Sequence, residues 1–181
     1  LSLRRQRQMC IRDSKGDLKG LTLTFFGDGQ SNMAHSYALA GVTAGMHVRI
    51  ASPADYAPRA DIVEAADRRA AETGGSITLF TDAVEAAAGA DVVVTDTWVS
   101  MGKEEEKLAR IRDLGGYKVT PETMEIADSE AIFIHCLPAD RGYEVDSEVI
   151  DGPQSVVWDE AENRLHAQKA LLVWLLDKKD A

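Results

Sequence analysis

Short apolar stretches that alternate with amphipathic stretches are the feature of this sequence that most restricts its fold. From Leu21 onward, each apolar or β-branched stretch is followed by a turn and then by a segment with helical periodicity. Few polar residues interrupt the apolar stretches, as is typical of strands buried on both faces of a parallel sheet. We therefore expect a doubly wound α/β domain with a mainly parallel, Rossmann-like sheet of about five strands flanked by helices.

The pattern also predicts where each element lies. The last helix has the clearest start, because Asp159 and Glu162 have the spacing of a capping box. Ligands bind such sheets at the carboxyl ends of the strands, so the residues that follow strands are candidate site residues. The expected strands are Leu21–Phe26, His47–Ala51, Ser76–Phe80, Asp91–Thr95 and Ala131–His135, with Ser155–Val157 as a short sixth candidate. The expected helices are Asn32–Gly45, Ala60–Thr73, Ala83–Ala88, Glu104–Arg112, Pro121–Ala127 and Glu160–Leu176.

Composition narrows the classes of partner. The length of 181 residues suits one domain, and the formal net charge of −10 disfavours a nucleic-acid partner. The longest apolar run, Ala170–Leu176, is too short to cross a membrane, and Cys10 and Cys136 cannot form a disulfide framework. We expect a cytoplasmic protein without a membrane partner.

The N-terminal stretch differs from the rest of the chain. Arg4, Arg5, Arg7 and Arg12 make it basic, with no acidic residue before Asp13. We expect residues 1–15 to be a disordered or non-native leader and residues 16–181 to form the α/β domain. A targeting or RNA-contacting arm is the alternative for the leader.

The first strand runs into a glycine-rich loop, Gly27-Asp28-Gly29-Gln30-Ser31-Asn32, that leads into a helix. Free backbone N–H groups at a helix start favour a carboxylate or phosphate, but a tight glycine turn without a ligand explains the loop equally well. The match to a dinucleotide-binding loop is weak. Asn32 stands where a third glycine is wanted, and the second strand ends in Ile50-Ala51-Ser52-Pro53 without an acidic residue.

Two more strand ends and one helix carry further candidates. Asp96 is suited to an ammonium group, and a turn or cap aspartate is the alternative. His135 and Cys136 are neighbours on one strand, so their side chains should point apart and a direct Cys–His dyad is not expected. Arg164 lies near a helix start, either in a surface pair with Glu160 or in contact with a ligand. Histidine and cysteine spacing indicates no metal site.

Four segments, in this order, resemble the second half of the ornithine carbamoyltransferases. The resemblance covers roughly Gly16 to Asp177. The cysteine in the third segment and the Ser-Met-Gly in the second are features of ornithine-using members, whereas aspartate-using relatives carry Pro in place of the cysteine. The segments are Gly27-Asp28-Gly29 with Asn32 and His35-Ser36, then Asp96-Thr97-Trp98-Val99-Ser100-Met101-Gly102, then His135-Cys136-Leu137-Pro138, then Glu162-Asn163-Arg164.

The resemblance implies an amino-acid site. Asn32 would bind the α-carboxylate of L-ornithine, and Asp96 would pair with its α-ammonium group. Ser100 and Met101 would lie on a loop that closes over the amino acid. All four are therefore expected substrate-binding residues.

The resemblance also implies the reaction and the residues nearest to it. Cys136 and the backbone of Leu137 would face the reacting δ-amino group, and Arg164 would contact carbamoyl phosphate. The neutral amine would attack the carbamoyl carbon and phosphate would leave, giving citrulline without a metal or organic cofactor. Cys136, Asp96 and Arg164 are the expected catalytic residues, with the protonation state of Cys136 left open.

One departure from the family pattern concerns the other substrate. The family's first domain carries a Ser-Thr-Arg-Thr-Arg phosphate loop and a His-Pro pair, and neither motif occurs in this sequence. We therefore expect the chain to be inactive alone and to depend on the missing N-terminal domain. The family also implies a homotrimer or a multiple of it, and its last helix packs on the first domain, so we expect Ala170–Leu176 to be exposed and prone to association.

Three alternatives remain open from the sequence. A sister carbamoyltransferase would use putrescine or an N-acylated ornithine, although Asp96, Ser100 and Met101 favour a free α-amino acid. A nucleotide-binding Rossmann-type module is disfavoured by the weak loop match. A non-catalytic amino-acid-binding or interaction domain is the third.

Overall fold

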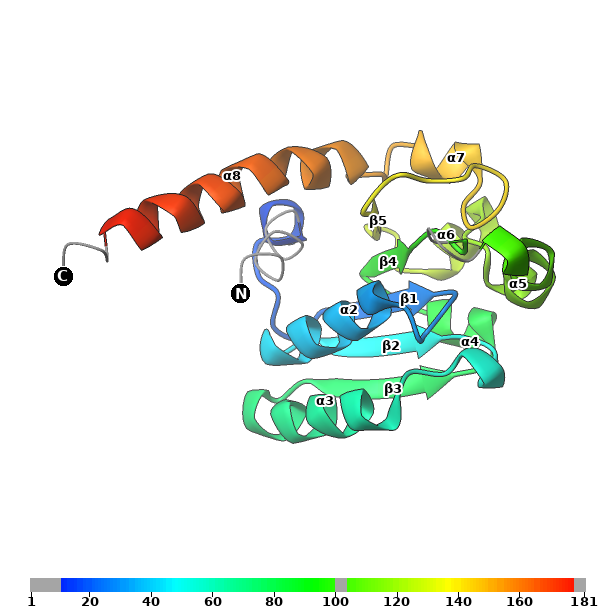
Figure 1. Cartoon of the computed structure of the whole chain (residues 1–181), viewed down its shortest axis with the longest axis horizontal. Coiled ribbons are helices and arrows are strands. Elements are labelled where there is room, and N and C mark those ends of the chain that lie inside the picture. The colour runs from blue at the N-terminus through cyan, green and yellow to red at the C-terminus, as the bar shows by residue number, and fades with distance from the viewer. Residues whose placement is uncertain (1–10, 100–103, 178–181) are drawn as a thin grey trace.

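The computed structural model describes residues 11–99 and 104–177, and it shows a parallel sheet between two layers of helices (Figure 1). All strand pairs are parallel, and the order in the sheet is β3-β2-β1-β4-β5. This confirms the expected doubly wound α/β fold. The strands are β1 (Thr22–Phe26), β2 (His47–Ala51), β3 (Ser76–Phe80), β4 (Val92–Thr95) and β5 (Ile132–His135).

Helices cover both faces of the sheet. α2 (Asn32–Thr43) and α3 (Ala60–Thr73) contribute to the core on one face. α4 (Ala83–Ala87), α6 (Pro121–Ile126) and α7 (Ser147–Ile150) contribute to the core on the other. The remaining helices are α5 (Lys107–Leu114), α8 (Val157–Asp177) and the 3-10 turns η1 (Ala54–Tyr56), η2 (Glu104–Glu106) and η3 (Gly115–Tyr117).

The two cores explain why the strands are apolar almost throughout. Side chains alternate along a strand, so each strand supplies both faces. In β4, Val92 and Val94 belong to the core under α2 and α3, whereas Val93 belongs to the opposite core. A polar residue at any of these positions would need its own buried partner, as Thr24 has in the carbonyl of Ala86 at 2.9 Å.

Most element boundaries lie within one or two residues of those expected, and two expectations were wrong. The sixth strand is only a bridge between Phe133 and Ser155, because the chain leaves it at once to begin α8 at Val157. Asp159 then lies inside the first turn of α8 and is not its N-cap, so the expected capping box does not form there. The short helix α7 was not predicted.

The end of the basic leader packs on the domain. Residues 11–15 are helical, and Ile11 is 1% exposed within the core that α2 also joins. The ammonium group of Lys15 donates to the backbone carbonyl of Glu130. Residues 11–15 therefore form part of the described structure, and residues 1–10 lie outside it, so the expectation of a disordered or non-native leader stays a prediction.

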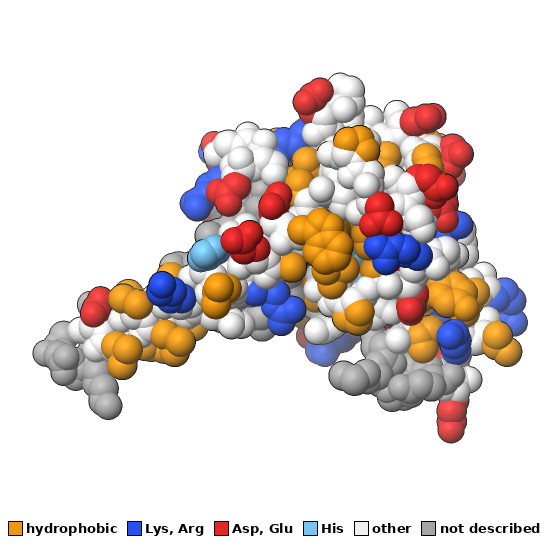
Figure 2. All heavy atoms as spheres, turned by 90° about the horizontal axis from the view of Figure 1, so that it is seen from above, with side chains coloured by type: hydrophobic (Ala, Val, Ile, Leu, Met, Phe, Trp, Pro, Cys, Tyr) orange, Lys and Arg blue, Asp and Glu red, His pale blue; other side chains and the backbone are white. Residues whose placement is uncertain are grey.

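Only the first half of α8 has residues buried against the rest of the domain. Val157, Glu160 and Ala167 are buried, but large apolar side chains are exposed along the part that extends from the body of the molecule (Figure 2). None of the described helices is long and apolar enough to cross a membrane. The exposed apolar residues of α8 are Trp158, Leu165, Leu172, Val173, Trp174, Leu175 and Leu176.

We predict that this surface makes the chain self-associate as its concentration rises, since exposed apolar surface drives association in water. The double variant Leu172→Glu with Leu176→Glu, which lie one helical turn apart, should reduce association. Sedimentation velocity over a concentration series measures the effect. Gln168→Glu adds charge on the same helix without removing apolar surface and should change little. A wild-type chain that stays monomeric at every concentration would contradict the prediction.

Candidate functional site

The strand order places the loops after β1, β4 and β5 together at one edge of the sheet. β1 pairs with β2 on one side and β4 on the other, and β4 pairs with β5. Since the strands are parallel, their carboxyl ends share that edge, and the point between β1 and β4 is where the strand order reverses. This is the expected place for a ligand in an open α/β sheet.

The loop after β1 is a tight turn that satisfies many of its own polar groups. The side chain of Asp28 accepts from the N–H of Gln30 at 2.9 Å, and the Asp28 carbonyl accepts from the N–H of Ser31 at 3.1 Å. Ser31 is the N-cap of α2, and its hydroxyl accepts from the N–H of Ala34 at 3.1 Å. Asn32 is then the first residue of α2, with an exposed side chain at the positive end of a helix.

Gly27 is required where this loop meets the next one. Its φ is +116°, and a Cβ there would lie 3.1 Å from the indole nitrogen of Trp98. Trp98 belongs to the loop after β4 and is 2% exposed. The two loops are therefore packed directly against each other.

Arg110 on α5 joins the same two loops through a buried ion pair that the sequence did not reveal. One guanidinium nitrogen donates to the Asp28 carboxylate, and Nε donates to the carbonyl of Trp98. The guanidinium also lies over the ring of Tyr56, 5.2 Å from its centre. Arg110 and Asp28 are 4% and 7% exposed, so the pair is shielded from water. The sequence offered one indication that Arg110 is buried, namely that it lies one helical turn before the buried Leu114 on α5.

Asp96 and Cys136 come together across neighbouring strands. Asp96 follows β4, is 8% exposed, and accepts from the N–H of Thr97 at 2.8 Å through Oδ1. The half-buried thiol of Cys136, which follows β5, donates to the same oxygen at 3.3 Å. Asp96 therefore makes a turn contact, as in the simpler interpretation, and also faces a candidate reactive side chain.

His135 and Cys136 point apart, as the strand alternation predicted. The Nδ1 atom of His135 accepts from the N–H of Leu137 at 2.9 Å and its Nε2 atom lies near Glu144, whereas Cys136 contacts Asp96. Leu137 has a φ of +53°, in the left-handed region that residues with a Cβ rarely adopt. A direct Cys–His dyad does not form.

Arg164 differs from the other candidates because it lies on α8 and not at a strand end. Its side chain is exposed. One interpretation made Glu160 a surface partner of Arg164, and it was wrong about where Glu160 lies. Glu160 is 4% exposed and accepts from the Tyr37 hydroxyl at 3.3 Å, so it is buried. The expected site residues Ser100 and Met101 lie outside the described residues.

Burial and neighbouring charges shift the pKa of two groups near the loop after β1. Burial, followed by the charge of Arg59, lowers the pKa of His35 below its usual value. Burial, followed by the charge of Asp113, raises the pKa of Tyr56. The hydroxyl of Tyr56 donates to Asp113 at 3.3 Å. No group of three or more possible metal ligands occurs among the described residues.

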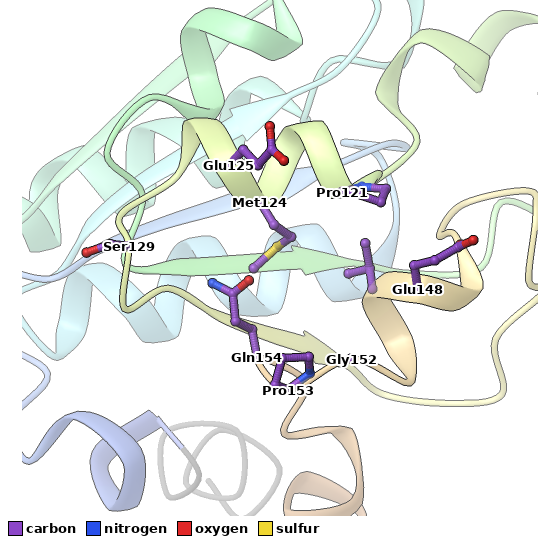
Figure 3. A pocket seen from close by; sticks show the side chains of 9 residues that line it. Pro121, Met124, Glu125, Ser129, Glu148, Gly152, Pro153 and Gln154 are labelled. Atoms are coloured by element: carbon purple, nitrogen blue, oxygen red, sulfur yellow. The ribbon is translucent and has the colours of Figure 1, made fainter.

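A separate groove lies between α6 and α7 (Figure 3). It has a volume of about 460 Å³, with Met124 and Val149 in its lining and Glu125 and Glu148 among its acidic residues. None of the expected site residues lines it, so it is not part of the strand-end site.

Comparison with known proteins agrees with this geometry. Residues 19–175 match the family described as "Aspartate/ornithine carbamoyltransferase, Asp/Orn binding domain". This chain belongs to that family. It is 70% identical to an ornithine carbamoyltransferase of Clavibacter sepedonicus over 93% of the chain and 55% of that protein, and 66% identical to one of Leifsonia xyli over 93% and 54%. The chain thus spans about half the length of the curated relatives it matches.

Solved structures of the carbamoyltransferase family share the fold. The ornithine carbamoyltransferase of Pyrococcus furiosus has a TM-score of 0.89 and 44% identity, covering 94% of this chain and 54% of its own. An N-acetyl-L-ornithine transcarbamylase has a TM-score of 0.82 and 28% identity, covering 94% and 55%. The carbamoyltransferase fold is therefore shared by members whose names give different substrates.

We predict that the buried ion pair stabilises both carbamoyltransferase loops. Arg110→Met should lower the free energy of unfolding by about 3–5 kcal/mol, because Asp28 would remain as a buried charge without its partner. Asp28→Asn added to Arg110→Met should recover much of that loss. Urea unfolding measures both changes. Arg69→Met, which breaks the exposed pair of Arg69 and Glu72 at 2.6 Å, is the control and should change stability far less. Equal losses in the two single variants would contradict the prediction.

Proposed function

We propose that this chain is the amino-acid-binding part of an ornithine carbamoyltransferase. In that reaction the δ-amino nitrogen of L-ornithine forms a bond to the carbamoyl carbon of carbamoyl phosphate, and the carbon–oxygen bond to phosphate breaks. The products are L-citrulline and phosphate, as in arginine biosynthesis. The contact between Asp96 and Cys136, at the carboxyl ends of β4 and β5 and next to the switch point of a carbamoyltransferase sheet, is the observation that supports the proposal.

Asp96 has the properties of a receptor for an α-ammonium group. Its carboxylate is largely shielded from water, and one oxygen is held by the Thr97 N–H and the Cys136 thiol. Because this carboxylate is already held in place, binding a cationic amine costs little further side-chain entropy. Its shielding also strengthens the charge interaction.

Asn32 supports the proposal from the neighbouring strand. It stands exposed at the first position of α2, where the helix dipole favours a negative group. Because β1 and β4 are adjacent, Asn32 and Asp96 follow neighbouring strands. A free amino acid, which carries one carboxylate and one ammonium group, suits this pairing.

Cys136 and Leu137 are the groups we assign to the δ-amino end. The Leu137 N–H is taken by His135, so the carbonyl is the polar backbone group that Leu137 offers to an amine. Cys136 donates to Asp96, which is a contact that a protonated thiol makes. The amine must lose its proton before it attacks, and in this arrangement the thiol already holds one. We therefore propose that Cys136, as a protonated thiol in this arrangement, positions the amine.

Carbamoyl phosphate and the assembly complete the proposal. We assign Arg164 to carbamoyl phosphate, since an exposed guanidinium recognises phosphate well. Binding of that substrate would depend on a domain of the kind that carries the family's phosphate loop. We also propose the homotrimer and the cytoplasmic location that the family implies, with the exposed part of α8 contacting that domain.

The relatives favour L-ornithine over other amines. Identity is 70% to a protein named ornithine carbamoyltransferase and 28% to one named N-acetyl-L-ornithine transcarbamylase. A substrate acylated on its α-nitrogen would lack the cation that Asp96 is placed to bind. Putrescine would lack the carboxylate assigned to Asn32.

The first test of the proposed function is calorimetric titration of L-ornithine into the purified chain. Asp96→Asn should weaken binding by about tenfold to a hundredfold, because one charge-assisted hydrogen bond to a shielded carboxylate is lost. Asp128→Asn is the matched control: Asp128 accepts from the N–H of Glu130 at 2.9 Å, a turn contact like that of Asp96, but it precedes β5. Equal weakening by both variants, or no binding by the wild type, would count against the proposal. A thermal shift with NAD would favour the nucleotide-binding alternative instead.

A second test matches substrate groups to residues. Asn32→Ala should weaken L-ornithine binding by about fivefold to tenfold and leave putrescine binding unchanged, because putrescine has no carboxylate. N-acetyl-L-ornithine should bind less well than L-ornithine to the wild type and should be insensitive to Asp96→Asn. The same calorimeter measures all pairs. Tightest binding of putrescine or N-acetyl-L-ornithine would favour the sister carbamoyltransferases.

A further inference from the structure

His135 and Glu144 form a polar pair in the interior, behind the turn that follows β5. Both are 0% exposed, and the Nε2 atom of His135 lies 3.4 Å from the Oε1 atom of Glu144. The direction of the contact is poorer than that of a good hydrogen bond, since Nε2 meets no acceptor in full hydrogen-bond geometry among the described residues. Burying polar or charged groups is unfavourable unless they are hydrogen-bonded, so the position of this pair needs a structural explanation.

The hydrogen bonds fix which nitrogen of His135 carries the proton. The N–H of Leu137 donates to Nδ1 at 2.9 Å, so Nδ1 has to be an acceptor and holds no proton. A neutral imidazole then carries its proton on Nε2, the atom that faces Glu144. Glu144 therefore favours the one tautomer that can hold the Leu137 N–H.

Glu144 holds the turn at a second point as well. Its Oε1 atom accepts from the N–H of Asp140 at 2.6 Å. The segment between Leu137 and Asp140 is thus fixed at one end through His135 and at the other end directly. This matters because Leu137, at a φ of +53°, has a conformation that its own side chain disfavours.

We propose that Glu144 is a positioning residue that acts through His135. By keeping Nδ1 of His135 free to accept from Leu137, it holds the turn in which the Cys136 thiol contacts Asp96 and the Leu137 carbonyl is oriented. The part of this proposal that concerns ornithine rests on the proposed function. Glu144 itself contacts no substrate.

Nitrogen NMR of the imidazole and amide hydrogen exchange test the structural part without any ligand. In the wild type, His135 should show a protonated Nε2 and an unprotonated Nδ1, and the Leu137 amide should exchange slowly. Glu144→Ala should mix the two tautomers and speed Leu137 exchange by about tenfold. Glu144→Gln keeps a carbonyl oxygen at the acceptor position and should preserve both signals.

Ornithine titration tests the functional part. Glu144→Ala should weaken binding by about tenfold, whereas Glu144→Gln and the control Glu148→Gln should stay within about threefold. Glu148 is an exposed glutamate on α7, four residues further along the chain.

A double variant tests whether Glu144 acts through His135. His135→Asn keeps an acceptor near the Nδ1 position but has no atom that reaches Glu144. In the His135→Asn chain, Glu144→Ala should weaken ornithine binding less than it does in the wild type, because the contact between Glu144 and His135 is already absent.

The outcomes separate this proposal from the proposed function. A protonated Nδ1 in the wild type, unchanged Leu137 exchange in Glu144→Ala, or fully additive effects of the two substitutions would overturn the positioning role. A wild type that shows the expected tautomer but binds no ornithine would count against the proposed function instead. If Glu144→Ala does not fold, as thermal unfolding would show, the wild-type tautomer and the Glu144→Gln signals still test the proposal. A protonated Nδ1 in the wild type, or loss of the tautomer preference and of slow Leu137 exchange in Glu144→Gln, would overturn the positioning role.

Discussion

At the centre of the sheet, β1 pairs in parallel with β2 on one side and with β4 on the other, and the candidate site depends on this arrangement. The chain moves from β1 toward β3 at one edge and then returns through β4 to β5 at the other edge (Figure 1). The loops after β1 and β4 consequently lie side by side at the point where the strand order reverses. Asn32, Asp96 and Cys136 are far apart in the sequence, but each follows a strand at this one edge.

Buried charged and imidazole side chains are concentrated near that edge. Asp28, Asp96, Arg110, His135 and Glu144 all lie in or directly behind the loops at the carboxyl ends of the strands. The strand interiors that face the two cores are almost entirely apolar. Since an apolar residue would be easier to bury at each of these positions, their grouping indicates that these side chains fix the geometry of the loops.

The fold was predictable because the hydrophobic pattern determines it. The expected range of His47–Ala51 is the observed range of β2, and that of Ala60–Thr73 is the observed range of α3. The start of α8 was missed because a tertiary contact decides it: the N–H of Val156 donates to the carbonyl of Phe133, and the helix begins one residue later. A local capping pattern cannot compete with that constraint, so Asp159 ended up inside the helix.

The candidate site was only half predictable, for a physical reason that His135 and Glu144 illustrate. Strand alternation alone required His135 and Cys136 to point apart, and the structure has them so. The partner of His135 could not be found in the same way, because Glu144 lies in an irregular segment with no periodicity to indicate that it is buried. Arg110 is a similar case, since its partners belong to two loops that are distant in the sequence. Local patterns specify the direction of a side chain on a regular element, whereas the partner that fixes it is chosen by the tertiary fold.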